Sequence, residues 1–198
     1  MFLPLAMAML AADSIAGEAH EGTLRYLLTV PVGRTRLLLT KFASLAIGAF
    51  IGVFLVVFVG AGVGVALFGA GPMLTLSGTT IGAADALGRV LLAGLYVWAG
   101  MVALTALGLF VSTLTEQPMA VVVIVMVIVA TMWILAGLEQ ASWLHPYLLV
   151  THWTAFVDLL RQPPAPDAMV DGLRLDAAYV IVFLSGAWAR FKGKDITG

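Results

Sequence analysis

The amino-acid sequence predicts an all-α fold, a polytopic transmembrane helical bundle. Hydrophobic residues occupy 62% of the 198 positions and charged residues only 11%, against roughly a quarter in ordinary soluble domains. The few charges are also clustered, so that long stretches carry none. A soluble domain of this size cannot bury so much apolar surface. The composition therefore excludes a soluble enzyme, a disordered chain and a nucleic-acid-binding protein.

The uncharged stretches predict four full spans. A helix needs about 20 residues to cross a hydrocarbon core of about 30 Å, and in lipid its backbone groups must bond to one another. We predict transmembrane helices over 42–68, 90–112, 118–138 and 173–190. The last stretch is the least apolar, and it spans only if Arg174 and Asp176 reach back to the membrane interface.

Residues 1–12 form a fifth apolar segment that is too short to span by itself. We interpret it as the end of a truncated helix, so that the bundle has four full spans and a partial N-terminal one. A signal peptide is the alternative, but the segment has no basic start and no cleavage site leading into a secreted domain.

The basic residues predict the orientation. Seven of the ten Lys and Arg residues lie in segment 13–41 or at the end of the chain, from Arg190 onward. Because Lys and Arg favour the cytoplasmic side, we place segment 13–41 and the tail 191–198 in the cytoplasm. Segment 139–172 is then outside, and the chain is a multi-pass protein of the cell membrane with a cytoplasmic C-terminus.

Segment 13–41 holds the most informative pattern. We expect the preceding helix to end near Gly17 and a short amphipathic helix to follow along the membrane surface, with Glu18, Glu21 and Arg25 on its polar face. Glu21 and Arg25 are four residues apart and can pair. Such an element can transmit force from a soluble partner to the spans. A plain interfacial helix that only anchors the loop is the alternative.

Ten residues of this segment form a recognisable series: Gly17, Glu18, Glu21, Gly22, Thr23, Leu27, Leu28, Pro31, Arg34 and Lys41. The series resembles the signature of ABC-2 type transporter permeases, although one more residue separates the two acids than in its commonest form. The basic tail resembles the family's ending. The stretch Thr151–Thr154 resembles the multidrug and copper-maturation branches.

The resemblance implies a membrane-spanning permease subunit of an ATP-driven exporter. Such a subunit forms the substrate pathway with a second permease, identical or paralogous, and a separate ATP-binding subunit docks on its cytoplasmic loop, here about Glu18 to Thr29. The coupling residues that it implies are Glu18, Glu21, Gly22, Thr23, Arg25, Leu28, Pro31 and Arg34. A family unit has six helices, so we expect the amphipathic elbow, the first helix and half of the second to be missing here.

The sequence offers no catalytic centre. A phosphate-binding loop needs a spaced Gly before Gly-Lys-Ser or Gly-Lys-Thr, whereas the one Gly-Lys pair, Gly193-Lys194, precedes Asp195. We therefore predict no ATP hydrolysis by this chain, no cofactor and no catalytic residue. A metal site at His145, His152 and Asp158 is disfavoured, because histidines beside Trp and Tyr are typical of the aromatic belt at a membrane interface.

Glycines recur at four-residue spacing in the first predicted full span, as Gly48 and Gly52 and again as Gly60 and Gly64. This spacing lets helices approach closely. We favour packing within the chain over a dimer interface.

Two other classes of function remain open. One is a membrane scaffold or assembly subunit without a pathway of its own. The other is a self-contained secondary carrier, which we disfavour because carriers need an ionisable group within the spans and we expect none there. Asp85 and Arg89 are predicted to pair with each other at a helix start.

Overall fold

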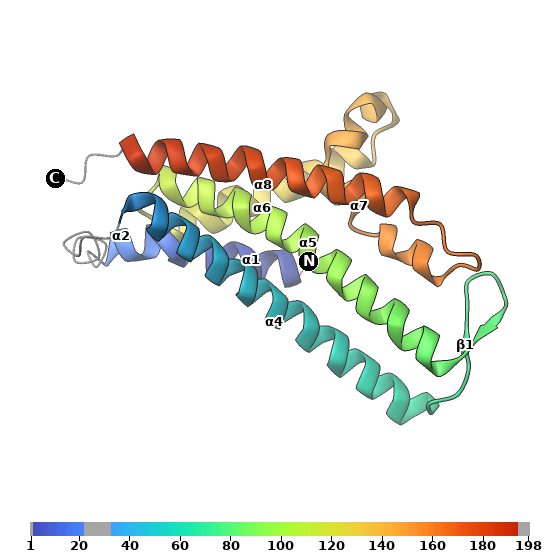
Figure 1. Cartoon of the computed structure of the whole chain (residues 1–198). Helices are drawn as coiled ribbons and strands as arrows, with labels where there is room; N and C mark the ends of the chain where they lie inside the picture. Colours follow the sequence, from blue (N-terminus) through green and yellow to red (C-terminus); the bar gives the residue numbers. More distant parts are fainter. Residues whose placement is uncertain (1, 22–32, 194–198) are drawn as a thin grey trace.

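The computed structural model describes residues 2–21 and 33–193. It confirms the all-α prediction, because helices dominate these residues (Figure 1). The α-helices are α1 (Phe2–Ala12), α2 (Glu18–His20), α4 (Arg34–Phe68), α5 (Ala83–Leu114), α6 (Pro118–Ala136), α7 (Leu149–His152) and α8 (Asp167–Gly193). A π-helical turn, η1 (Asp13–Gly17), joins α1 to α2, and two 3-10 helices, η2 (Glu139–Tyr147) and η3 (Ala155–Leu160), flank α7.

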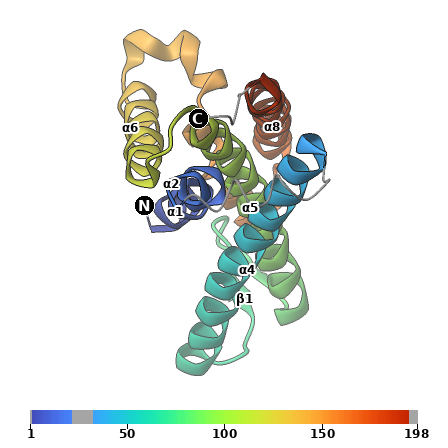
Figure 2. The ribbon, with the colours of Figure 1, turned by 90° about the vertical axis from the view of Figure 1, so that its left-hand side faces the viewer.

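Helix α5 is the centre of the bundle. It packs against α1, α4, α6 and α8, most extensively against α8, and Figure 2 shows these helices arranged around it. It approaches α1 closely, since a Cβ atom added at Gly108 would lie 2.7 Å from the Cβ of Ala11. Small residues at such positions permit tight helix packing in a membrane, where lipid and side chains are equally apolar.

Four helical segments are long and apolar enough to cross a membrane: Phe2–His20, α4, α5 and α6. The N-terminal segment is therefore longer than the predicted 1–12, because the π turn carries the helix past Gly17 to His20. Helix α8, which contains the predicted span 173–190, is not one of these four, and it lies along α5 (Figure 1).

Three helices begin earlier than the predicted spans. Helix α4 starts at Arg34 and not at 42, α5 starts at Ala83 and not at 90, and α8 starts at Asp167 and not at 173. A charged residue limits the part of a helix that lies in lipid, but it does not end the helix. At 35 residues, α4 is about 52 Å long, well beyond the thickness of the hydrocarbon core.

Polar contacts show which helix ends lie together. The Arg34 guanidinium donates to the Lys192 carbonyl over 2.9 Å, and the Ala16 N–H donates to the Ser112 hydroxyl over 2.9 Å. The start of α4 therefore lies beside the end of α8, and the end of the α1–α2 segment lies beside the end of α5. We call this the loop end, because residues 21 and 33, on either side of the undescribed segment 22–32, lie here.

The opposite end, which we call the hairpin end, carries the antiparallel strands β1 (Met73–Leu74) and β2 (Thr80–Ile81). The N–H of Leu76 donates to the Leu160 carbonyl over 2.9 Å, which joins the hairpin to η3.

The predicted Asp85–Arg89 pair is wrong, since none of the salt bridges among the described residues joins these two side chains. The Arg89 guanidinium donates instead to the Leu159 and Arg161 carbonyls, each over 2.8 Å. A planar guanidinium carries several fixed donors, and the C-terminal end of η3 with the residues that follow it offers several acceptors.

Candidate functional site

The π turn η1 places backbone groups within reach of α5. A π turn widens the helix, and such turns occur frequently at functional sites. Here the Ala16 N–H donates to Oγ of Ser112, which donates in turn to the Ala12 carbonyl over 3.3 Å. Ser112 is fully buried, so one hydroxyl satisfies a donor and an acceptor that would be costly to bury alone.

Lys41 joins the two chain segments that enter and leave the loop. Its ammonium donates to the Ser14 carbonyl and to Oε2 of Glu18, both over 2.5 Å. The Lys41 side chain is 12% exposed and that of Glu18 is 30% exposed. Because the pair is shielded from water, it holds its geometry better than a surface ion pair does. The end of α1–α2 is thereby fixed to the second turn of α4.

A second set of contacts fixes α8 to the start of α4. Besides the bond from Arg34 to Lys192, the indole N–H of Trp188 donates to the Thr35 hydroxyl over 2.9 Å. The Lys192 ammonium lies 5.0 Å from the centre of the Trp188 ring, within the range of a cation–π interaction. We refer to Ser14, Glu18, Lys41, Ser112, Arg34, Thr35, Trp188 and Lys192 together as the loop-end clamp.

The clamp contains part of the predicted coupling set. Glu18 lies in it, Arg34 lies in it, and Glu21 is exposed directly after α2. The other predicted coupling residues, and with them the pair Glu21–Arg25, lie outside the described residues: Gly22, Thr23, Arg25, Leu28 and Pro31. Sequence reasoning missed Ser112 and Trp188, because a lone Ser or Trp near a helix end carries no pattern that assigns it a partner.

The four glycines of α4 fall into two pairs with different surroundings. A Cβ atom added at Gly48 would lie 3.6 Å from Leu10, and one added at Gly52 would lie 3.6 Å from Met7, so both face α1. Gly60 and Gly64 meet no atom within 4 Å of such a Cβ atom in the described part of the chain. Their role in packing stays a prediction.

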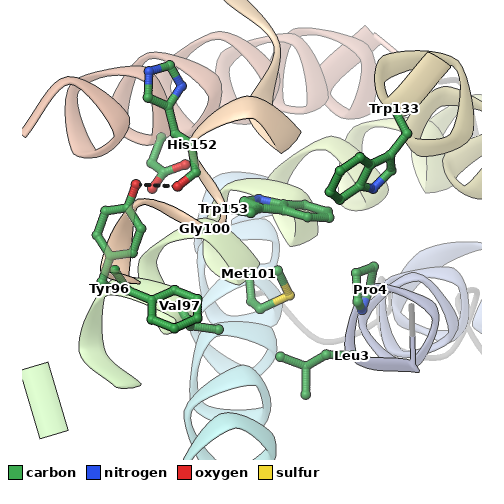
Figure 3. A pocket seen from close by; sticks show the side chains of 11 residues that line it. Leu3, Pro4, Tyr96, Val97, Gly100, Met101, Trp133, His152 and Trp153 are labelled. Atoms are coloured by element: carbon green, nitrogen blue, oxygen red, sulfur yellow. Dashed lines mark hydrogen bonds between the residues drawn. The ribbon is translucent and has the colours of Figure 1, made fainter. Parts of the chain in front are cut away.

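A cavity of about 240 Å³ lies between the helices, away from the loop-end clamp. Its walls come from α1, α5, α6, η3, α8 and the end of α7 with the residue that follows it (Figure 3). The lining residues are Leu3, Pro4, Tyr96, Val97, Gly100, Met101, Trp133, His152, Trp153, Phe156 and Asp176. The Tyr96 hydroxyl donates to the His152 carbonyl over 2.7 Å, which joins α5 to the end of α7 at one side of the cavity.

Asp176 corrects one of the predictions from the sequence. It does not reach back to the membrane interface, because it is 7% exposed and lines the cavity. Arg174, which was predicted to behave likewise, is exposed and pairs with Asp171 over 2.8 Å. Sequence alone gives no rotational setting for α8, so it could not show that Asp176 faces the bundle interior. An ionisable group therefore lies inside the bundle, contrary to the expectation from the sequence.

Asp176 is also without a partner. Among residues 2–21 and 33–193, no hydrogen bond or ion pair reaches its carboxyl group. Two other polar atoms of the cavity lining, Nε1 of Trp153 and Nδ1 of His152, are buried without a hydrogen-bond partner. Unpartnered buried polar groups are rare in folded proteins and mark sites of strain, chemistry or ligand binding.

The histidines do not form a metal site with each other. Nε2 of His145 lies 3.1 Å from the Leu135 carbonyl and 3.2 Å from the Leu138 carbonyl, so the ring caps the end of α6. No group of three potential metal ligands exists among the described residues.

Residues 1–191 match the family described as ABC-2 family transporter protein. The chain belongs to this family. A stretch of 54 residues is 48% identical to the probable ABC transporter permease protein NosY of Pseudomonas aeruginosa and 46% identical to that of Stutzerimonas stutzeri. Each match covers 25% of this chain and 20% of the relative, so the aligned stretch spans about a fifth of the curated relatives' length. Together with the apolar helices, the family makes this chain a multi-pass membrane protein.

Proposed function

We propose that this chain is the permease subunit of an ABC-2 type exporter and that a separate ATP-binding subunit acts on the segment from Glu18 to Thr29. The observation that carries the proposal is the contact of Lys41 with both Glu18 and Ser14. It fixes the two ends of the loop to each other, so that a force on the loop moves α1–α2 and α4 together.

The clamp also gives that force a route to the rest of the bundle. Ser112 joins the π turn to α5, the central helix, and Arg34 joins α4 to α8. An ATP-binding subunit shifts the permease between two states only by the difference in its contact energy with them. Contacts that couple the loop rigidly to α5 and α8 convert that energy into a rearrangement of the spans.

The partners in this proposal are the ATP-binding subunit, a second permease subunit and the bilayer. The loop end faces the cytoplasm, where ATP is available, and the hairpin end faces outward. The exposed Glu21 is a suitable reporter, because the chain has no cysteine and a single Cys can therefore be attached to a probe without background.

The test is site-specific cross-linking in membranes that hold the complete transporter. We expect Glu21→Cys to form a cross-link with the ATP-binding subunit. The matched control, Ala70→Cys, is exposed at the hairpin end and should form none. A membrane-impermeant thiol reagent should label Ala70→Cys in intact cells and Glu21→Cys only after permeabilisation. Cross-linking from residue 70 instead, or labelling of residue 21 from outside, would overturn the proposal.

Buried Asp176 gives a secondary carrier renewed support as the second candidate, since carriers place ionisable groups inside the bundle. The two functions differ in their response to the clamp. Glu18→Gln and Lys41→Gln should each lower ATP-driven transport by about tenfold if the loop couples the subunits, with little loss of protein from the membrane. Transport by the chain alone, driven by an ion gradient and unchanged in both variants, would establish the carrier instead.

A further inference from the structure

We propose that the cavity beside Asp176 binds a small hydrophobic organic cation, a protonated amine with an apolar or aromatic body. Asp176 would accept the ammonium group, and the surrounding rings would enclose the rest. Binding is a property of this chain by itself. That the bound cation is also transported rests on the proposed function.

Asp176 places a buried acid at the cavity wall. Its carboxyl group is buried, and the cavity lining contains no Lys or Arg. A buried carboxylate without a counter-ion costs several kcal/mol, so the group must be either protonated or paired with a cation that enters the cavity. The described residues provide no such cation, and an ammonium ligand would provide it.

Aromatic residues form much of the cavity wall. The rings of Tyr96, Trp133, Trp153 and Phe156 all line the cavity, and Figure 3 shows Tyr96, Trp133 and Trp153 with Met101 between the helices. The faces of aromatic rings attract a cation within about 6 Å, most strongly for Trp. Met101 adds a flexible, polarisable surface that adapts to different apolar groups. Such walls suit an organic cation and not a strongly hydrated ion.

Trp153 and Asp176 both approach α5 at Gly100. A Cβ atom added there would lie 3.3 Å from Nε1 of Trp153 and 3.9 Å from Oδ2 of Asp176. The indole edge and the carboxylate therefore border the same point of α5. The carboxylate offers an acceptor to the ammonium N–H, and the indole ring beside it forms part of the wall.

An inorganic cation fits this lining less well. Calcium takes six to eight oxygen ligands, and structural zinc sites use four protein ligands. The lining offers a single carboxylate, from Asp176, and the imidazole of His152 points away from the other lining side chains (Figure 3). One negative charge in an otherwise apolar and aromatic cavity matches a singly charged ammonium group.

The test is calorimetric titration of the purified chain in lipid nanodiscs with three probes of one shape. The probes are phenethylammonium, neutral 2-phenylethanol and anionic 3-phenylpropionate, and empty nanodiscs provide the blank. We expect phenethylammonium to bind at least about tenfold more tightly than 2-phenylethanol and 3-phenylpropionate to show no binding. Equal affinities for the cation and the alcohol would overturn the proposal, because the cavity would then act only as an apolar space.

Variants locate the binding. Asp176→Asn removes the charge and keeps the shape, and it should weaken phenethylammonium binding at least about tenfold. It should leave 2-phenylethanol binding unchanged. Asp171→Asn is the matched control, since Asp171 lies in the same helix but is exposed, and it should bind as the wild type does. Unchanged cation binding in Asp176→Asn would place the site elsewhere and overturn the assignment.

Trp153→Phe should weaken cation binding several-fold, because the Phe ring attracts a cation less strongly than the indole does. If Asp176→Asn does not fold, the three-probe comparison on the wild type and the Trp153→Phe result still decide the question. None of these titrations uses the ATP-binding subunit, so a failure here leaves the cross-linking test of the proposed function untouched.

Discussion

Two regions of this bundle, the loop-end clamp and the cavity, differ in whether their buried polar groups have hydrogen-bond partners. At the loop-end clamp, buried Ser112 and shielded Lys41 both have partners, and each joins two helices. Around the cavity, the Asp176 carboxyl group has no hydrogen bond or ion pair from the described residues, and Nε1 of Trp153 and Nδ1 of His152 are buried without a hydrogen-bond partner. The difference fits the two proposals, in which the clamp couples the loop to the helices and the cavity binds a ligand.

The largest expected effect comes from Gly172, where α8 contacts α5 beside the cavity. A Cβ atom added at Gly172 would overlap the hydroxyl of Tyr96 and lie 2.9 Å from the Cβ of His152. Gly172→Ala should therefore push α8 away from α5 and lower the unfolding free energy by about 3 kcal/mol, the upper range for overpacking.

The control for that variant is Gly60→Ala, where an added Cβ atom meets nothing within 4 Å. It should be neutral or slightly stabilising, since Ala favours a helix over Gly by about 1 kcal/mol. Thermal unfolding in detergent measures both, and an equal effect of the two variants would show that Tyr96 does not approach Gly172.

The next effect has the opposite sign. Asp176→Leu replaces an unpaired buried carboxyl with an apolar side chain of similar size, so we expect the unfolding free energy to rise by about 1–3 kcal/mol. Binding of phenethylammonium should disappear in the same variant. A loss of stability would mean that Asp176 has a structural partner, and the contrast between the clamp and the cavity would then be wrong.

At the clamp, removal of a polar group should destabilise. Ser112→Ala leaves the Ala16 N–H buried without an acceptor, at a cost of about 1–3 kcal/mol. Ser44→Ala is the control, because the Ser44 hydroxyl is exposed and bonds only to the Thr40 carbonyl of its own helix. Its unfolding temperature should stay within error of the wild type, and a drop equal to that of Ser112→Ala would remove the special role of Ser112.

The smallest effect concerns the contact between α4 and α8. Trp188→Phe loses the hydrogen bond to Thr35 and weakens the contact with Lys192, so we expect a loss of about 0.5–1.5 kcal/mol. Hydrogen exchange of the first turn of α4 is the sensitive measurement. Unchanged exchange there would show that Arg34 alone holds the two helix ends together.

Much of the fold was predictable because charges are scarce. The three long uncharged stretches, within 42–68, 90–112 and 118–138, predicted α4, α5 and α6. An apolar run of that length satisfies its backbone groups in lipid by forming a helix. The loop end was also predictable in part, because the spacing of Glu18 and Lys41 belongs to a recognisable series. Helix limits were harder, because Lys41 and Arg174 lie inside α4 and α8 and limit a membrane crossing without ending the helix.

The cavity was not predictable from the sequence. Asp176 and Arg174 are two residues apart and look equivalent as flanking charges, yet the rotation of α8 buries the first and exposes the second. That rotation is decided by packing against α5, where Gly172 lets Tyr96 approach. Arg89 was misassigned for a related reason, since its partners Leu159 and Arg161 lie far away in the chain.

The π turn Asp13–Gly17 has a mechanical consequence for the whole transporter. It contains one residue more than the same turn of an α-helix would, so the helix holds one surplus residue at this point. Conversion of this turn to a regular α-helical turn would rotate the residues beyond Gly17 by about 100° around the helix axis. It would also break the hydrogen bond between Ala16 and Ser112. In the proposed function, a displacement applied at Glu18 would then reach α1 as a rotation about the helix axis.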